Sequence, residues 1–541
     1  MNRHELASFI LSFAEKTGME TFREQAAGEI VRITRPYDAV PDIYSEYRQI
    51  IHDGIVFLLS NFSPARLTAI VADQLLMEEN SPVQERLIRL ARQVPTLHKL
   101  GQTIARNRNV DESFRKWLIC LENDLHGTST ADVRRKIAGE ISSFKKAFSI
   151  RTADEILAEA SVGAVMAFTW LKPDTGTREK GVFKILRPGV KEHLSEELNL
   201  LDELAFFFDK NRERYILKDF RFIETFRDIK EALKEETDLS GEQANLRRAF
   251  LFYGKAKSAR ISRVLPFSTE NLTAMEFMNG DKITDISNCS ADRKLYAQIL
   301  FDTVIGHPLF SHEKQTLFHG DPHAGNIYGF AGEKQEEMTV ALLDWSQAGH
   351  LSKKERMNML WLMIGVITAD EKIICEAVGE LSEEENPILL KKVRRIIHDI
   401  LVSHEYANCS LVKKTFFVID QSTIRGIRFP RELLLFRKAF FTLEGVLYDL
   451  DPAFDMDVCM IRLGRNLFME ELPKRWMYLL FPQSDRPEHY KIMLSNSDLH
   501  GFANHIFIES FKKSADVFTA LMEKNAEFLS KAFCLGLKGE G

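Results

Sequence analysis

The sequence predicts an α+β fold, in which a small strand-containing region is flanked by long helical stretches. Residues 4–120 carry apolar side chains at three- and four-residue spacing, interrupted by prolines, which is typical of packed helices. Segments 164–170 and 182–186 instead alternate apolar and polar side chains and are joined by a turn-rich stretch, which indicates a strand pair. A second strand pair is predicted at 327–330 and 339–343, within a C-terminal half that is otherwise helical.

Composition places the chain among ordinary globular proteins. Of its 541 residues 45% are apolar and 28% charged, and a net charge of -6 argues against dedicated nucleic-acid binding. The apolar run 357–369 is shorter than the roughly 20 residues of a membrane-spanning helix, so we expect a core helix there. The first residues show no export signal, and the six cysteines form no Cys-x-x-Cys pair. A cytoplasmic setting is therefore expected.

The strongest chemical pattern is His319-Gly-Asp-Pro-His-Ala-Gly-Asn326, followed by Asp344 at the end of a predicted apolar strand. Phosphoryl transfer requires a positioned acceptor hydroxyl, magnesium and neutralised phosphate charge. In kinase catalytic loops an Asp and, five positions later, a metal-binding Asn supply part of this. Asp321 and Asn326 have that spacing, so Asp321 is the candidate catalytic residue. Asn326 and Asp344 are the candidate magnesium ligands.

This loop has two alternative interpretations, a turn between helices and a metal hydrolase site. An Asp-, Gly- and Pro-rich turn between helices would explain the loop alone, but it would not explain a second Asp after a buried strand. A metal hydrolase would use His319 and His323 as ligands. Gly320 and Pro322 disfavour the helix that such a pair needs, and no Glu general base accompanies it.

Lys184 lies on an alternating, half-buried strand, where a lysine needs a partner to offset its desolvation. In kinase folds such a lysine reaches the α- and β-phosphates and is held by a helical Glu. Glu236 is the best candidate partner on a helix predicted over 221–249, although several acids on that helix compete for the role. A solvent-facing strand lysine is the alternative.

Small side chains precede the first predicted strand and would let backbone amides approach phosphate closely. The candidate nucleotide-binding residues there are Leu157, Ala158, Ala160, Ser161, Val162, Gly163, Ala164 and Val165. An ordinary turn of small residues is the alternative. Two further strands are predicted at 261–265 and 272–277. Glu276 ends the second of them, whose backbone would form the adenine-binding hinge.

Taken together, these motifs resemble the UbiB/ADCK (AarF-type) family of atypical kinases. Lys99-Leu-Gly-Gln102 resembles the Lys-x-Gly-Gln motif of that family, and Ala158-Glu-Ala-Ser161 resembles its alanine-rich loop. The segments 183–189, 236–238 and 319–326 resemble its lysine strand, Glu-x-Asp motif and catalytic loop. The resemblance covers roughly residues 95–457.

The resemblance implies a protein-kinase-like two-lobed fold with ATP or ADP and Mg2+ as cofactors. It also implies that Glu236 pairs with Lys184 and that a regulatory helix carrying Lys99 and Gln102 lies over the active site. The expected regions are an N-terminal helical region (1–94), a helical extension (95–150), an N-lobe (151–280), a C-lobe (281–457) and a C-terminal extension (458–541).

The sequence departs from the family pattern at Ala324 and at Trp345-Ser346, which leaves two alternatives open. Asp344-Trp345 fits aminoglycoside/choline-type phosphotransferases, and Ser346 would fit a pseudokinase scaffold that binds nucleotide without turnover.

The expected activity is phosphoryl transfer to a small molecule, a lipid or water, with a link to isoprenoid or quinone lipids implied by the resemblance. Only seven positions separate Asp344 from Leu351, too few for the peptide platform of protein kinases, so protein substrates are not expected. A Phe-rich amphipathic pattern over 507–529 predicts a helix that packs on its own domain or contacts a membrane peripherally.

Overall fold

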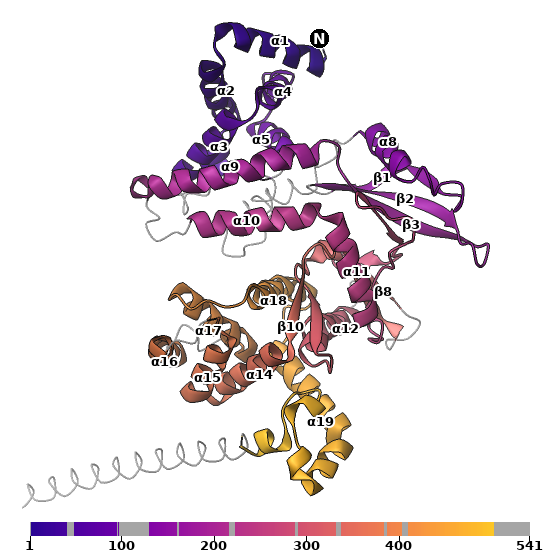
Figure 1. Ribbon diagram of the computed structural model, residues 1–541, viewed down its shortest axis with the longest axis vertical. Coiled ribbons are helices and arrows are strands. Elements are labelled where there is room, and N and C mark those ends of the chain that lie inside the picture. Colours follow the sequence, from indigo (N-terminus) through magenta and orange to yellow (C-terminus); the bar gives the residue numbers. More distant parts are fainter. Residues whose placement is uncertain are drawn as a thin grey trace, which may run out of the picture. The chain divides into compact units, whose positions relative to one another are not determined.

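The computed structural model describes residues 2–39, 48–94, 96, 129–159, 162–215, 222–286, 290–331, 337–383, 387–402 and 409–501 (Figure 1). The chain forms two compact units. The first consists of Met1–Lys255, Arg260–Gly280 and Ala341–Ala348, and the second of Ala256–Ala259, Asp281–Val340 and Gly349–Gly541.

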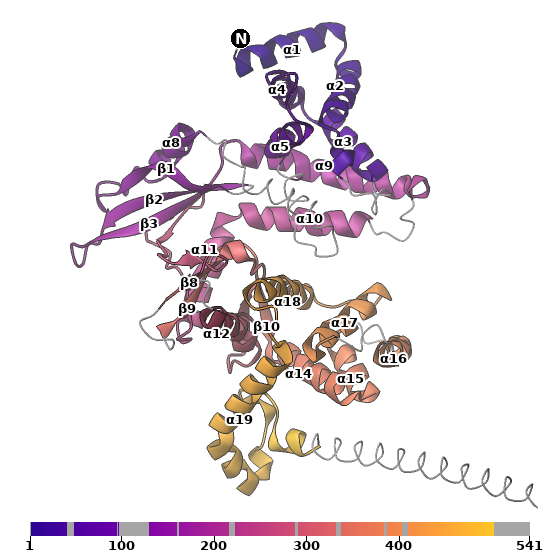
Figure 2. The ribbon, with the colours of Figure 1, turned by 180° about the vertical axis from the view of Figure 1, so that it is seen from behind.

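The N-terminal part of the first unit is helical, as predicted. Its helices are α1 (Arg3–Thr17), α2 (Met19–Thr34), the short 3-10 turn η1 (Pro36–Ala39), α3 (Arg48–Asn61), α4 (Pro64–Leu75) and α5 (Val83–Gln93). A capping box between Asn2 and Glu5 begins α1, and Pro64 occupies the first turn of α4, where its missing amide costs nothing. Apolar side chains of α2–α5 share one core with α9 (Val190–Lys210) and α10 (Phe222–Thr237). Figures 1 and 2 show α9 and α10 side by side.

The sheet of the first unit is antiparallel and has the order β1-β2-β3-β5. Its strands are β1 (Arg151–Glu159), β2 (Gly163–Leu171), β3 (Arg178–Leu186) and β5 (Leu272–Glu276), and α8 (Thr130–Glu140) packs beside them. The predicted pair β2–β3 is confirmed, with Val165 opposite Lys184. On the other side of β3, Lys184 lies opposite Thr273 of β5.

Strand β1 was not predicted, because a helix was expected to end at Arg151, the first residue of β1, and residues 157–165 were expected to form a turn before the first strand. Its composition explains the error: Ala, Glu and Leu favour helices, and most of its side chains are exposed or half-buried. Hydrogen bonding to β2 decides the conformation instead, which local propensity cannot reveal.

The helix predicted over 221–249 is two helices, α10 and α11 (Leu239–Tyr253). Asp238 stands between them as the N-cap of α11, and its side chain accepts a hydrogen bond of 2.9 Å from the amide of Gly241. An N-cap residue leaves the helical conformation, so the chain can change direction there. The second helix therefore presents a different set of acids from the first.

The second unit carries most of a four-stranded sheet of order β4-β9-β8-β6 and a two-stranded sheet of β10 and β7. The strands are β4 (Ala259–Arg260), β6 (Asp281–Lys282), β7 (Gln315–His319), β8 (Ile327–Phe330), β9 (Thr339–Leu342) and β10 (Ala348–Ser352). The predicted pair β8 and β9 is confirmed. The strand predicted at 261–265 is wrong, since that segment contributes only an isolated bridge between Val264 and Met275.

Helices make up the rest of the second unit. They are α12 (Ser290–Phe301), the π-turn η4 (Asp302–Gly306), α13 (His307–Leu309), α14 (Lys353–Thr368), α15 (Glu371–Leu381), α16 (Pro387–Val402), α17 (Leu411–Ile424), α18 (Arg431–Leu450) and α19 (Met456–Leu480). The capping box of Ser352 and Glu355 begins α14. No helix within the described ranges combines the length and apolarity needed to cross a membrane.

Candidate active site

Lys184 is the centre of the polar cluster in the first unit. It lies on strand β3, which is hydrogen-bonded to β2 on one side and to β5 on the other. The Lys184 side chain is only 13% exposed. The Nζ atom lies 2.7 Å from Oε1 of Glu242 and 3.0 Å from Oδ1 of Asp344. A buried ammonium group is stable only with such partners. The structure therefore brings the predicted lysine and the predicted metal ligand together.

The partner of Lys184 is Glu242, and the predicted pairing with Glu236 is wrong. Glu236 lies in the last turn of α10, whereas Glu242 lies in the first turn of α11, beyond the cap at Asp238. The side chain of Glu242 is 2% exposed and faces the sheet. The signal that could have identified it was the capping residue Asp238, which starts a new helix and resets the helical face.

The three charges shift one another's ionisation. Burial lowers the pKa of Lys184, but Asp344 and Glu242 together outweigh this and raise it above its ordinary value. Burial raises the pKa of Asp344, but the positive charge of Lys184 and the hydrogen bonds from Lys184 and Ser346 together outweigh this and lower it well below its ordinary value. For Glu242 the ionised form is disfavoured. Burial and the nearby negative charge of Asp344 raise its pKa to about 7 despite the positive charge of Lys184.

Asp344 follows β9 by two residues and has a left-handed backbone with φ of 57°. A non-glycine residue in this region is strained and is held there by its surroundings. Its Oδ1 accepts a hydrogen bond of 3.3 Å from the amide of Ser346. The next side chain, Trp345, is fully buried, and its Nε1 donates to the carbonyl of Leu342 at 3.0 Å. This tryptophan anchors the turn that presents Asp344.

Asn245 supports the same turn from α11. Its Nδ2 donates to the carbonyl of Trp345 at 3.1 Å. Asn245 stands three residues after Glu242, so both lie on one face of the helix. One helical face thus holds Lys184 through Glu242 and the backbone beside Asp344 through Asn245. Sequence reasoning missed this residue, because no pattern distinguishes it from other polar residues on the helix.

The predicted catalytic loop lies in the second unit and begins at His319, the last residue of β7. His319 is fully buried, and its Nδ1 accepts a hydrogen bond of 3.2 Å from the amide of Asp321. The Nδ2 of Asn326 donates to the carbonyl of Asp321 at 3.2 Å, so the two predicted residues are joined through the backbone. The Nε2 of His323 lies 4.0 Å from Oδ2 of Asp321. These contacts fix the loop with the Asp321 carboxylate 11% exposed.

The small-residue segment forms the connection between β1 and β2. Leu157 and Ala158 end β1, Val162 precedes β2, and Gly163, Ala164 and Val165 begin it. Ala158 pairs with Val165 across the two strands, and Ala160 and Ser161 lie outside the described residues. Residues 157–159 and 163–165 of this segment are therefore strand and not the expected loop.

The remaining predicted residues have separate positions. Glu276 ends β5 and forms an ion pair with Arg263, in addition to accepting from its backbone amide at 3.3 Å. Lys99 and Gln102 lie outside the described residues, so their expected regulatory role stays a prediction.

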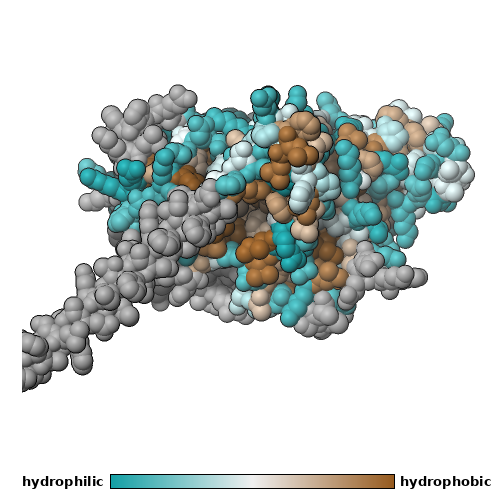
Figure 3. Space-filling view, turned by 90° about the horizontal axis from the view of Figure 1, so that it is seen from below, coloured by the Kyte–Doolittle hydropathy of each residue, from teal (hydrophilic) through white to brown (hydrophobic). Residues whose placement is uncertain are grey.

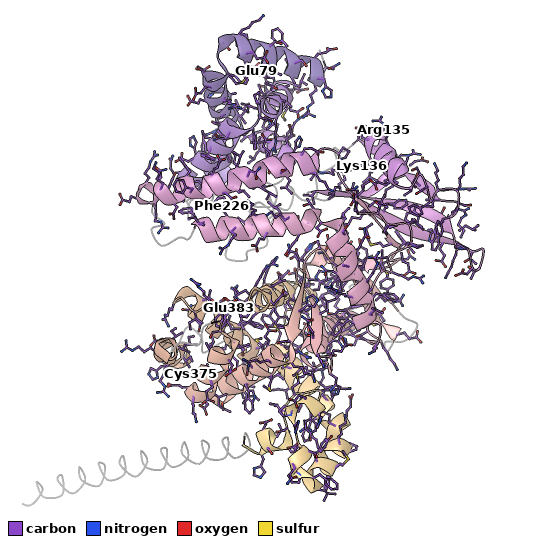
Figure 4. The ribbon with its side chains drawn as sticks, in the orientation of Figure 1. Glu79, Arg135, Lys136, Phe226, Cys375 and Glu383 are labelled. Carbon is purple, nitrogen blue, oxygen red and sulfur yellow. The ribbon has the colours of Figure 1, made fainter. Side chains whose placement is uncertain are left out.

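A lysine of α8 supports the end of the strand that carries Lys184. The Nζ of Lys136 donates to the carbonyl of Leu186 at 3.0 Å, and Figure 4 labels it beside Arg135 on this helix. Partial burial lowers the pKa of Lys136. The contact fixes the last residue of β3, two positions beyond Lys184.

The donor set suits a magnesium–nucleotide complex. Lys184 and the amide of Ser346 both contact Oδ1 of Asp344, and the Asp344 side chain is 37% exposed. In the part of the chain that the structure describes, no group of three or more His, Cys, Asp or Glu could enclose a metal. Magnesium held by Asp344 would take further ligands from phosphates and water, which is its usual arrangement with nucleotides. When bound, it would neutralise phosphate charge.

Comparison with known proteins finds a matching family model. Residues 120–378 match the ABC1 atypical kinase-like domain. The chain is 25% identical over 385 residues to the protein ACTIVITY OF BC1 COMPLEX KINASE 7, chloroplastic, of Arabidopsis thaliana, covering 70% of this chain and 53% of that protein. It is 23% identical over 416 residues to a probable protein kinase UbiB of Xanthomonas oryzae pv. oryzae, covering 73% of each.

The chain spans 53% and 62% of the lengths of the Arabidopsis protein and of a Synechocystis relative described as uncharacterized protein sll1770. Among solved structures, the complex of Rv3197 with erythromycin from Mycobacterium tuberculosis matches with a TM-score of 0.41 at 16% identity, covering 65% of this chain and 87% of the other. The fold is α+β and kinase-like, and the domain match together with the UbiB-named relatives supports a place in the UbiB/ADCK family of atypical kinases.

Proposed function

We propose that this protein binds ATP or ADP with Mg2+ and transfers a phosphoryl group to a small molecule, a lipid or water. The observation that carries the proposal is the buried contact of Lys184 with both Glu242 and Asp344. A strand lysine held by a helical Glu, beside an Asp that follows a strand, is the arrangement that kinase folds use for nucleotide phosphates.

Each residue would have a separate task. Lys184 would contact the α- and β-phosphates, and Glu242 would keep its ammonium group in place. Asp344 and Asn326 would hold Mg2+, and Asp321 would orient the attacking hydroxyl or water. The backbone of 157–165 would line the phosphates.

The acceptor is proposed to be a small molecule or a lipid, with water as the acceptor in the ATPase case. Strand β10 begins at Ala348 and α14 at Lys353, so only three residues separate Asp344 from the next strand. That length leaves no room for the long activation segment on which protein kinases dock peptides. Isoprenoid or quinone lipids are the proposed class, with peripheral membrane contact, and this part rests on the family alone.

The test is phosphate release from ATP by the purified protein, with and without lipid vesicles. We expect Mg2+-dependent release in the wild type and a loss of ~10²–10⁴-fold in Asp321→Asn. The control is Asp174→Asn, in the exposed turn between β2 and β3. Equal rates in Asp321→Asn and wild type would refute the catalytic role. Nucleotide binding without any release would instead identify a pseudokinase scaffold.

A further inference from the structure

Helix α11 carries a buried glutamine that has no task in the proposed phosphate site. Gln243 is 6% exposed and directly follows Glu242 in the first turn of this helix. Hydrophilic side chains normally face the solvent, as many do on the surface that Figure 3 draws. A buried amide group is costly unless hydrogen-bond partners satisfy it. The contacts of Gln243 therefore indicate what it does.

The partners of Gln243 lie at the start of β5. Its Nε2 donates to the carbonyl of Thr269 at 2.7 Å and to Oγ1 of the fully buried Thr273 at 3.2 Å. Thr269 belongs to the tight turn before the strand, in which its amide donates to the carbonyl of Leu272 at 2.8 Å. One side chain of α11 is thus hydrogen-bonded to both the turn and the strand.

Thr273 lies directly opposite Lys184 in the pairing of β3 with β5. Directly opposite residues of an antiparallel pair project from the same face of the sheet, with Cβ atoms roughly 4.5–5.5 Å apart. Thr273 therefore shares the face from which Lys184 reaches Glu242. Two consecutive residues of α11 contact two paired residues of the sheet, Glu242 through Lys184 and Gln243 through Thr273.

Other contacts fix the ends of α11 within the first unit. Asp238 caps its first turn, and Asn245 donates to the carbonyl of Trp345. At the last residue of the helix, the ring of Tyr253 lies 5.7 Å from the ring of Trp345, measured between centroids. Gln243 adds the attachment of the helix to the sheet.

We propose that Gln243 is a positioning residue, which fastens α11 to β5 and keeps the Lys184–Glu242 pair formed before nucleotide binds. Many protein kinases are switched by moving the helix that carries the glutamate, because its pair with the strand lysine is required for activity. In this chain, moving α11 away from β5 would leave the buried groups that bind Gln243 without their partner. The importance of the pair for phosphate binding rests on the proposed function.

The exposure of Lys184 distinguishes positioning from a general contribution to stability. The Lys184 side chain is 13% exposed, so a lysine-modifying reagent reaches its amine only when the pair opens. Lys230 on α10 has a similar exposure of 17% and an ion pair with Asp202, so it serves as the reference. Loss of the attachment at Gln243 should expose Lys184 selectively, whereas general destabilisation would expose both lysines.

The test is acylation of the complete, nucleotide-free chain by acetic anhydride, quantified at each lysine by mass spectrometry. We expect Gln243→Leu to raise the rate at Lys184 relative to Lys230 by roughly tenfold, the effect of one lost hydrogen bond on local opening. Thr273→Val is isosteric and removes only the 3.2 Å contact, so it should give a smaller rise in the same ratio.

The matched control is the same substitution at another buried glutamine of the first unit. Gln74 on α4 is 2% exposed, and its Nε2 donates to the carbonyl of Arg86 at 3.0 Å. Gln74→Leu should leave the acylation ratio unchanged. In calorimetry with Mg2+, ATP binding should weaken roughly 5–10-fold in Gln243→Leu and stay unchanged in Gln74→Leu.

Three results would overturn the proposal. One is an unchanged acylation ratio in both Gln243→Leu and Thr273→Val. Another is an equal rise at Lys184 and Lys230, which would limit Gln243 to general stability. The third is a raised ratio with unchanged ATP affinity. A wild type that binds no ATP would refute the proposed function instead, and the acylation ratio, measured without nucleotide, would still decide whether Gln243 holds the pair.

Discussion

Replacing Glu242 with Gln tests whether the ionised Glu242 carboxylate stabilises the Lys184 cluster as an ion-pair partner or destabilises it as a buried negative charge. Removing one partner of a buried ion pair usually costs about 3–5 kcal/mol, because the other charge is left uncompensated. Here Lys184 keeps Asp344 at 3.0 Å, so the substitution changes the net charge of the trio from -1 to 0. The pKa of Glu242, raised from 4.5 to about 7 by burial and by Asp344, shows that its ionised form is unfavourable in the fold.

The raised pKa sets the size and the pH dependence of the effect. Because the folded state holds the Glu242 proton more tightly, stability falls as the pH rises from about 4.5 to 7 and stays lower above that. The difference between the ordinary pKa and the folded-state pKa of Glu242 corresponds to about 3 kcal/mol of unfolding free energy at pH 8. We therefore expect Glu242→Gln to be more stable than the wild type at pH 8, by up to about 3 kcal/mol, and similar to it near pH 4.5.

The same substitution should weaken nucleotide binding, because only Asp344 would then position Lys184. Stability is measured by urea unfolding from pH 4.5 to 8 with a chelator present, and ATP affinity by calorimetry with Mg2+. Glu236→Gln is the control and should change neither quantity. A loss of 3 kcal/mol or more at pH 8 in Glu242→Gln, or the same ATP affinity as in the wild type, would refute the reasoning.

Three further substitutions test two other polar contacts of the first unit. Asn245→Ala removes the donor to the Trp345 carbonyl, so it should cost about 1 kcal/mol in urea unfolding. It should also raise the Mg2+ concentration needed for half-maximal ATP binding by roughly fivefold; an unchanged Mg2+ requirement would limit Asn245 to a structural role. Arg66→Met leaves the fully buried Glu197 without its ion-pair partner and should cost about 3–5 kcal/mol. Adding Glu197→Leu should recover much of that loss, and a double variant no more stable than Arg66→Met would contradict this.

Local patterns were sufficient where one strand or helix carries its own signal. The alternation of 164–170 and 182–186 predicted β2 and β3. Its place on an alternating, half-buried strand predicted that Lys184 has a partner, and the structure places it beside a second predicted residue, Asp344. These features depend on residues close together in the chain.

Features that depend on distant residues were missed. Strand β1 exists because β2 pairs with it, although its own residues favour a helix. The choice of Glu242 over Glu236 is a different case, because its signal was local: the cap at Asp238, which separates α10 from α11 by one residue. The role of Asn245 depends on a carbonyl one hundred positions away. Tertiary contacts decide such cases, and propensity scales do not contain them.

The most direct measurement is calorimetric titration of ATP into the wild type and Asp344→Asn, each with and without Mg2+. Asn is nearly isosteric with Asp, and Lys184 retains Glu242 at 2.7 Å, so the variant should fold. Asp202→Asn, which disrupts an ion pair with Lys230, is the control. We expect Mg2+ to tighten ATP binding in the wild type and in the control, and to have no effect in Asp344→Asn. The same Mg2+ response in Asp344→Asn as in the wild type would contradict the assignment of this cluster as a magnesium–nucleotide site.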